Sequence, residues 1–327
     1  MKQRPMEDAT MKRRLFMAVL LAFALVSFTF ASGNNDKGGS SGQAEYAVVL
    51  KTLVSPFWQG VEKGVKDRAA TLGITVDVYA ANSEDDIEGQ VQILENCITK
   101  GYKAIGVAPI SPVNLNSVIA QATKKGIYIV NIDEMVNRDN LRSQGGAVQG
   151  FVATDNKAVG ELGAGYIVSK VSGGGEVAII EGKAGNVSGE DRKEGAAKAF
   201  AAAGGFTVVS SQPADWDRTL AFDLASSLIT RFPNLKGIYA CNDTMAMGAI
   251  EAVKRAGKDI IVVGTDGNED AIASVKAGEL GATVAQDTSA IGGIGLEMLR
   301  DAYTGKVKID PNAEVPFRGA KAELITK

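Results

Sequence analysis

The chain has 327 residues and is 45% hydrophobic, 22% charged and 6% aromatic, a composition typical of a globular protein and unlike that of a disordered or disulfide-rich one. Its length is sufficient for two domains, each with a core of its own. Histidine is absent, which excludes His-based catalytic triads, histidine proton relays and histidine-containing metal sites.

The N-terminal segment has the layout of a secretory signal. Met11-Lys-Arg-Arg14 precedes an uncharged, mostly apolar run from Leu15 to Phe30, and small residues lie near the end of that run. Its 16 residues fall short of the ~20 that a transmembrane helix needs. We therefore predict a signal peptide over residues 1–32, cleaved near Ala31–Ser32, and export of the rest of the chain. The start of translation, Met1 or Met11, is left open.

Residues 33–43 are rich in Gly and Ser, which predicts a flexible linker. The first 32 residues carry five basic and two acidic side chains, so the rest of the chain has a net charge of −6 within the total of −3. An acidic chain without basic clusters is a poor candidate for binding nucleic acid. Cys97 falls in a predicted helix and Cys241 in a predicted strand of the other half, so we expect both to be buried and unpaired.

From residue 44 onward, β-rich runs alternate with helical patterns. Most of these runs are continuous stretches of Val, Ile and Ala, as in strands that are buried on both faces. A helical segment such as Gln59–Leu72 repeats apolar residues at helical spacing and ends at Gly73. Repeated strand–helix–strand units predict an α/β fold with parallel sheets and helices on both faces. The predicted strands are 46–50, 74–79, 104–108, 127–132, 148–153, 176–180, 206–210, 237–241, 260–264 and 281–285.

The two halves of the chain echo each other. Asp133 lies 30 residues beyond Lys103, and Asp266 lies 30 residues beyond Lys236. Each aspartate ends a matching strand–helix–strand unit. Two similar lobes that face one another would direct both aspartates into a shared cleft.

Several strands are followed by residues that suit a ligand site, which in α/β sheets lies beyond the carboxyl ends of the strands. Lys51 ends the first strand, and its place favours the cleft over a solvated surface charge. Phe57 and Trp58 open the next helix, where core packing and ligand stacking remain equally open. Trp216 lies among polar neighbours, where a core tryptophan would be unusual. Arg192 opens a later helix and is either exposed or a rigid donor fork for a ligand.

Carboxylates and amides end four further strands. Asp133 and Asp266 are either helix N-caps or acceptors whose two oxygens fit neighbouring hydroxyls on a ring. Asn242 and Gln286 each offer a donor and an acceptor side by side. Together with the aromatic faces and the arginine fork, these residues predict a carbohydrate site.

Other motifs are rejected, and no cofactor or metal is expected. The chain has no Walker A pattern, and the glycines 173–175 precede a strand instead of following one. Residues 266–270 imitate the start of a calcium loop, but Ala271 and Ala277 occupy the positions that need Gly and Glu.

Six segments carry a resemblance to a known family, and together they are specific for it. The chain resembles the periplasmic sugar-binding proteins of the ribose-binding type, which serve ABC transporters, over about residues 44–327. The segments are Glu45–Thr52, Pro56–Trp58, Val177–Asn186, Gln212–Arg218, Asn242–Gly248 and Val262–Gly267.

The resemblance implies the type 1 periplasmic-binding fold, in which two doubly wound parallel-sheet lobes are joined by a three-stranded hinge. The three crossings are expected near Thr154–Asp155, Gln286–Asp287 and Lys308–Asn312. The expected N-terminal lobe comprises residues 44–153 plus 287–309. The expected C-terminal lobe comprises residues 154–286 plus 310–327.

The resemblance also implies a set of sugar-contacting residues. Phe57 and Trp58 from one lobe and Trp216 from the other would sandwich the ring. Ser55 stands where the family usually has Asn, which is expected to loosen the affinity or shift the preferred sugar. The implied contacts are Lys51, Phe57, Trp58, Asp133, Arg192, Trp216, Asn242, Asp266 and Gln286, with Glu134 and Asn186 as weaker ones.

The implied function is non-enzymatic capture of a monosaccharide, with D-allose expected and ribose as a related alternative, by a monomer that delivers it to an ABC transporter permease. A sugar-sensing partner of a chemoreceptor or sensor kinase is the alternative. A sugar-responsive transcription regulator would need an N-terminal helix-turn-helix, where this chain has a signal sequence. A glycosidase could pair Asp133 with Asp266, but nothing in the sequence turns either residue into an acid catalyst.

Overall fold

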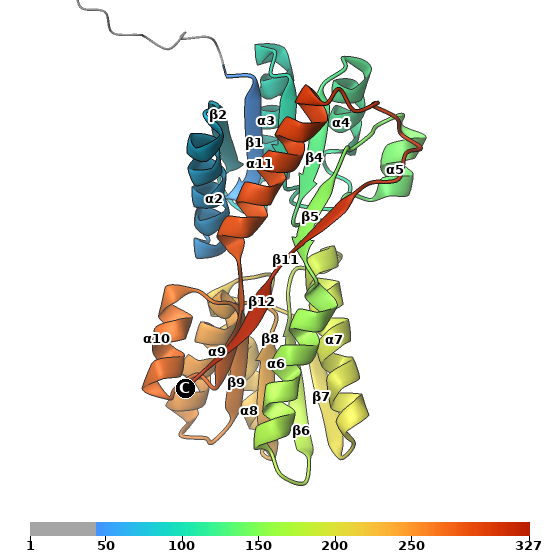
Figure 1. Ribbon diagram of the computed structural model, residues 1–327. Helices are drawn as coiled ribbons and strands as arrows, with labels where there is room; N and C mark the ends of the chain where they lie inside the picture. Colours follow the sequence, from blue (N-terminus) through green and yellow to red (C-terminus); the bar gives the residue numbers. More distant parts are fainter. Residues whose placement is uncertain (1–43) are drawn as a thin grey trace, which may run out of the picture. The chain divides into compact units, whose positions relative to one another are not determined.

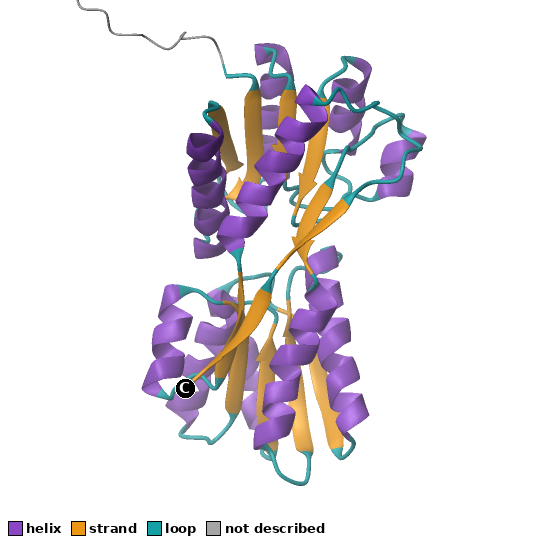
Figure 2. Cartoon of the chain, viewed as in Figure 1, coloured by secondary structure: helices purple, strands orange, loops and turns teal. Residues whose placement is uncertain are grey.

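The computed structural model describes residues 44–327, and the predicted signal peptide and linker lie outside these described residues. Residues 44–327 form two mainly parallel sheets of six strands each, with helices on their faces (Figures 1 and 2). This confirms the two-lobed α/β prediction. All ten predicted strands are present, with ends that differ by up to three residues.

The first lobe holds one sheet and five of the helices. Its strand order is β11-β5-β4-β3-β1-β2, and every pairing in it is parallel. The elements are β1 (Tyr46–Thr52), α2 (Pro56–Leu72), β2 (Val76–Ala81), α3 (Ile87–Lys100), β3 (Ala104–Val107), α4 (Asn116–Lys124), β4 (Tyr128–Ile132), α5 (Arg138–Ser143), β5 (Phe151–Thr154), α11 (Thr288–Thr304) and β11 (Phe317–Ala320).

The second lobe repeats this arrangement in the order β12-β10-β9-β8-β6-β7. Only the pairing of β12 with β10 is antiparallel. The elements are α6 (Asn156–Lys170), β6 (Gly175–Glu181), α7 (Val187–Ala203), β7 (Phe206–Pro213), α8 (Arg218–Arg231), β8 (Leu235–Ala240), α9 (Asp243–Ala256), β9 (Ile261–Asp266), α10 (Glu269–Ala277), β10 (Ala282–Gln286) and β12 (Ala322–Thr326).

Local sequence signals account for the elements next to the site. Helix α2 begins with Pro56, whose missing N–H costs nothing in a first helical turn, and is followed by the C-cap residue Gly73 with φ 65°. Its face with Val61 and Val65 is buried, as the helical spacing predicted. Strand β1 is buried at every position, because helices cover both faces of its sheet.

The third connection between the lobes corrects the sequence-based expectation. The chain passes from β5 into α6 after Thr154 and from β10 into α11 after Gln286. The third crossing lies at Lys321, between β11 and β12, and not near Lys308–Asn312. Residues 317–320 pair with β5 in the first sheet, so assigning them to the second lobe was wrong. Figure 1 shows the two strands running from one lobe to the other.

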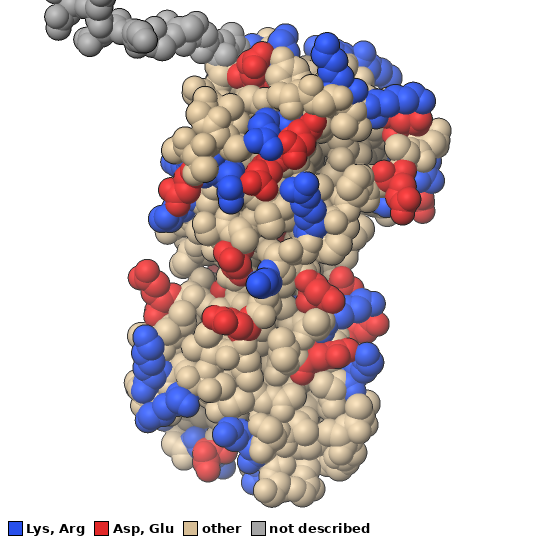
Figure 3. All heavy atoms as spheres, in the orientation of Figure 1, with Lys and Arg blue, Asp and Glu red and all other residues tan. Residues whose placement is uncertain are grey.

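Two further expectations can be checked on the described residues. Cys97 and Cys241 are buried and unpaired, which confirms the prediction. None of the helices within residues 44–327 combines the length and the apolarity needed to cross a membrane. On the face shown in Figure 3, basic and acidic side chains are intermingled.

Candidate functional site

A small pocket lies beyond the carboxyl ends of the strands of both sheets and takes its lining from both lobes. Its volume is about 40 Å³. Eight of the predicted site residues line it: Lys51, Phe57, Trp58, Asp133, Arg192, Trp216, Asn242 and Asp266. The other lining residues are Ser55, Glu84 and Ser188.

The three remaining predicted residues are connected to this pocket but do not line it. Glu134 accepts a hydrogen bond from the Lys51 ammonium at 3.3 Å. Asn186 accepts one from the Trp216 indole N–H at 3.1 Å. Gln286 donates one to Asp266 at 2.8 Å. These three residues therefore hold lining side chains in place, and direct contact with a ligand stays a prediction for all eleven.

Lys51 is buried within a network of opposite charges. Its Nζ lies 3.3 Å from Glu134 Oε2 and 3.8 Å from Glu84 Oε2. It also lies 5.8 Å from the centroid of the Trp58 ring, and the Trp58 indole N–H donates to Glu84 at 2.9 Å. Burial opposes the charge, but the surrounding carboxylates outweigh burial and raise the pKa of Lys51. The ammonium is therefore a fixed cation at the pocket wall.

Asp133 presents an unsatisfied acceptor to the pocket. The residue is 5% exposed, and its Oδ1 has no hydrogen-bond partner among the described residues. Burial raises the pKa of this carboxyl to about 6, although Lys51 and Arg192 oppose the rise. A buried acceptor without a partner is costly unless a ligand satisfies it.

Asp266 occupies the equivalent place in the second lobe. Its Oδ1 accepts from Gln286 Nε2 at 2.8 Å and lies 3.4 Å from Arg192 Nη1. Burial raises the pKa of Asp266 to about 8, against the influence of Arg192 and Gln286. Gln286 Oε1 has no partner among the described residues, so it too is free to accept from a ligand.

Arg192 is not the exposed helix residue that its position allowed. It lies in the first turns of α7 and is 4% exposed. Its Nε donates to Asn156 Oδ1 at 2.9 Å, and its Nη1 donates to the Cys241 carbonyl at 2.7 Å. These contacts fix the plane of the guanidinium and leave other N–H groups of the fork for a ligand.

Trp216 is held at the pocket by small neighbours. The residue is partly buried and has φ 67°, in a turn with Asp215 at φ 51°. A Cβ on Gly182 would lie 2.0 Å from the indole ring, so only glycine leaves room for the ring there. The Arg192 guanidinium carbon lies 5.9 Å from its centroid. The Trp216 ring therefore lines the pocket and is not buried within the core of the second lobe.

The remaining predicted groups are only partly available. The Asn242 side chain caps α9 because its Oδ1 accepts from the Met245 N–H at 2.8 Å, which leaves its Nδ2 as a donor. Phe57 and Trp58 are both buried and meet edge to face, with ring centroids 4.9 Å apart. They therefore serve as core residues and pocket wall at once.

The sequence analysis did not identify two lining residues, Glu84 and Ser188. Glu84 follows β2 at the same sheet edge as Lys51 and Asp133, so the rule that placed those residues could have found it. Ser188 lies in the first turn of α7, where its hydroxyl donates to Glu134 Oε2 at 2.9 Å. No local pattern marks such a contact.

The side chains of the pocket are suited to binding a polar small molecule through hydrogen bonds and ring contacts. It combines two cations, three carboxylates, amide and hydroxyl groups and aromatic rings, which together suit a small molecule with several hydroxyl groups. Within residues 44–327 there is no group of His, Cys, Asp and Glu side chains that could hold a metal ion.

Comparison with known proteins agrees with this fold. The family described as "Periplasmic binding protein domain" matches residues 46–306. The D-allose-binding periplasmic protein of Escherichia coli is 54% identical over 87% of this chain and 92% of its own length. The ribose import binding protein of Bacillus subtilis is 32% identical over 93% of this chain and 95% of its own length.

Solved structures give the same answer. An ABC transporter periplasmic solute-binding protein from Actinobacillus succinogenes, with bound D-allose, is 31% identical with a TM-score of 0.79. The match covers 86% of this chain and 96% of that one. These relatives are binding proteins and not enzymes. The chain belongs to the periplasmic binding protein family, as a non-enzymatic member with the type 1 fold.

Proposed function

We propose that this protein captures a monosaccharide between its lobes, with D-allose as the expected sugar and ribose as the related alternative, for delivery to an ABC transporter. The observation that carries the proposal is the pairing of Asp133 and Asp266. They come from equivalent strand ends of the two sheets and line one pocket together with Arg192 and Trp216. The names of the E. coli and A. succinogenes relatives support D-allose.

Each group has a defined part in this proposal. The two aspartates accept from pairs of ring hydroxyls, while Arg192, Lys51 and the Asn242 amide donate to sugar oxygens. Trp216 and the Phe57–Trp58 wall cover the C–H faces of the ring. Because the donors and acceptors come from both lobes, only the sugar-filled cleft satisfies them all, and the sugar therefore favours lobe closure.

The magnitudes are sufficient. Micromolar affinity requires about 8 kcal/mol. Several hydrogen bonds to charged partners, at about 1.5–3 kcal/mol each, exceed this value before the costs of ordering the sugar and closing the lobes. Asp133 contributes most to selectivity, since a sugar that lacks a matching hydroxyl leaves its buried acceptor unpaired.

The cellular setting is part of the same proposal. The predicted signal peptide over residues 1–32 exports the chain to the periplasm, where it acts as a monomer and delivers its sugar to a membrane permease. The similarity to proteins named as periplasmic supports this location.

The test is calorimetry of the mature protein against allose, ribose, psicose, galactose and glucose, together with thermal unfolding. Asp266→Ala should abolish the rise in unfolding temperature that sugar produces while leaving the fold intact. Asp223→Ala, at an exposed position of α8, is the matched control and should behave as the wild type. Sugar-induced stabilisation that persists in Asp266→Ala would contradict the assigned cleft.

A further inference from the structure

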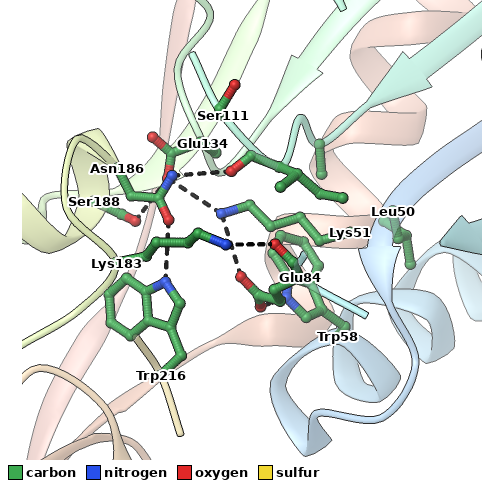
Figure 4. Close-up of polar contacts among 12 residues, drawn as sticks. Leu50, Lys51, Trp58, Glu84, Ser111, Glu134, Lys183, Asn186, Ser188 and Trp216 are labelled. Atoms are coloured by element: carbon green, nitrogen blue, oxygen red, sulfur yellow. Dashed lines mark hydrogen bonds and ion pairs between the residues drawn. The ribbon is translucent and has the colours of Figure 1, made fainter. Parts of the chain in front are cut away.

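The carboxylate of Glu134 connects the two lobes. Glu134 follows β4 in the first lobe, yet its Oε1 accepts from the Val187 N–H of the second lobe at 2.5 Å. Its Oε2 accepts from the Ser188 hydroxyl at 2.9 Å and from Lys51 at 3.3 Å. The side chain is fully buried. Figure 4 shows Glu134 and Lys51 facing Ser188 and Asn186 across this contact.

Helix α7 depends on this carboxylate because its own N-cap is otherwise engaged. Asn186 occupies the N-cap position but makes no side-chain cap hydrogen bond. Its Oδ1, the atom that would cap the helix, accepts instead from the Trp216 indole N–H at 3.1 Å, and its Nδ2 donates to the Ile110 carbonyl of the first lobe at 3.0 Å. By contrast, α8 and α11 are capped by their own Asp217 and Asp287. A helix N-terminus carries unpaired N–H groups and a partial positive charge, and here the acceptor comes from the other lobe.

A second contact holds the loop that precedes α7. Lys183 Nζ donates to the Glu84 carbonyl at 3.1 Å and also bonds the Asp85 carboxylate. Lys183 belongs to the second lobe, whereas Glu84 and Asp85 belong to the first. The first lobe therefore holds the start of α7 by two separate contacts, one through Glu134 and one through Lys183.

We propose that Glu134 is a positioning residue that sets sugar affinity by latching α7 to the first lobe, without binding the sugar itself. This inference rests on the proposed function. Glu134 does not line the pocket, and its two oxygens already accept from three donors. Opening the lobes exchanges the bonds to Val187 and Ser188 for water, so the latch favours the closed arrangement before any sugar arrives. The sugar then spends less of its binding energy on closure.

A latch and a direct contact predict different patterns of affinity. A latch changes only the equilibrium between open and closed lobes, so its loss weakens every sugar by the same factor. A direct hydrogen bond reads one hydroxyl, so its loss changes the preference between two sugars that present that hydroxyl differently. The ratio of the affinities for D-allose and D-ribose therefore separates the two roles.

The experiment compares Glu134→Gln and Lys183→Ala with the wild type. Calorimetry measures the affinities for D-allose and D-ribose, and small-angle scattering measures the radius of gyration without sugar. Glu134→Gln should weaken both sugars by about the same tenfold factor, since it removes charge-assisted hydrogen bonds. Lys183→Ala, at a partly exposed position, should weaken both about two- to threefold. Both variants should show a larger radius of gyration without sugar.

Glu190→Gln is the matched control, because Glu190 is another acidic residue in the first turn of α7. It accepts from the Gly185 N–H at 3.2 Å and pairs with Lys193, all within the second lobe. Its loss should leave both the sugar affinities and the radius of gyration unchanged. Unequal weakening of the two sugars by Glu134→Gln, or an unchanged radius of gyration, would overturn the latch. A wild type that binds none of the sugars would refute the proposed function, and the sugar-free scattering would still decide on the latch.

Discussion

Asp133 and Asp266 both place a carboxylate at the pocket from a backbone conformation that side chains rarely adopt. Their φ angles are 60° and 124°, and such positions persist only where the surroundings impose them. For Asp266 those surroundings include Asp243, which is fully buried and accepts from the Gly267 and Asn268 N–H groups at 2.8 Å. The Asp243 carboxylate thus fixes the turn after β9, and this turn places the Asp266 carboxylate at the pocket.

Sugar binding is predicted to release protons near neutral pH. Burial raises the pKa of Asp133 to about 6 and that of Asp266 to about 8, so both carboxyls bind protons more readily than usual in the free protein. Hydroxyl donors favour the ionised form, so a bound sugar lowers both pKa values. Affinity should therefore rise as the pH increases from 6 to 8. Calorimetry in buffers with different ionisation enthalpies measures the released protons.

Asp266→Asn provides the comparison for that measurement. It removes the titrating group with the higher pKa, so the variant should bind sugar more weakly and lose the pH dependence between pH 7 and 8. Asp133 still titrates in the variant, and the dependence below pH 7 should remain. Affinity that falls with rising pH in the wild type would show that the sugar favours the protonated carboxyls.

Sequence reasoning found the pocket side chains that follow from strand position and missed those that follow from contacts. Lys51, Asp133, Asn242 and Asp266 all lie where the carboxyl end of a strand meets the cleft, which one rule of α/β sheets predicts. Ser188 has its place because Glu134 lies opposite it, and the two residues are 54 positions apart. Such a pairing depends on how two lobes meet, and no local pattern records it.

At the scale of elements, Arg192 is positioned by the close approach of α6 and α7. A Cβ on Gly160 of α6 would lie 2.0 Å from the Arg192 carbonyl oxygen, and a Cβ on Gly195 of α7 would lie 2.1 Å from the Lys157 carbonyl oxygen. The two glycines therefore allow the helix backbones to touch. The donor fork of the pocket depends on this packing, although neither glycine lines the site.

Gly160→Ala is predicted to reduce both stability and sugar affinity. The added methyl group collides with backbone that cannot move independently, which costs about 1–3 kcal/mol of unfolding free energy and displaces the turn that carries Arg192. Denaturant unfolding and calorimetry with D-allose measure the two effects.

Gly165→Ala on the same helix is the control for that prediction, because a Cβ there meets nothing within 4 Å. It should stabilise the protein by about 0.5–1 kcal/mol through helix propensity and leave sugar affinity unchanged. Equal effects of the two substitutions would show that the contact between α6 and α7 does not position Arg192.

Strands that are buried in the sheets were predicted correctly, because burial requires a run of apolar residues that can be recognised in the sequence. The ten predicted strands are mainly apolar runs, and all of them exist. The strands β11 and β12 were not predicted individually, because each is short, lies at a sheet edge and includes charged residues such as Arg318 and Glu323. Edge strands are commonly protected by charge, which removes the pattern that identifies a buried strand.

At the scale of the whole described chain, the last eleven residues complete both lobes. β11 adds an edge strand to the first sheet, and β12 adds one to the second, with only Lys321 between them. The Lys321 carbonyl accepts from the Asp287 N–H at 3.0 Å, so two of the three crossings are bonded to each other. Both lobes therefore depend for part of their stability on residues 317–327, which cross from the first lobe to the second.

Stepwise deletion of this segment should separate the two lobes in their unfolding. Loss of residues 322–327 exposes the edge of β10, whose Gln286 donates to Asp266, and removes ladder hydrogen bonds worth about 1 kcal/mol each. The second lobe should then unfold at a lower temperature than the first, and sugar binding should weaken. Loss of residues 317–327 should lower the unfolding temperature of both lobes. Differential scanning calorimetry resolves the transitions, and a chain that lacks only Lys327, which lies beyond β12, is the control. If removal of residues 322–327 leaves a single transition at the temperature of that control, β12 does not stabilise the second lobe, and the two lobes remain one cooperative unit without it.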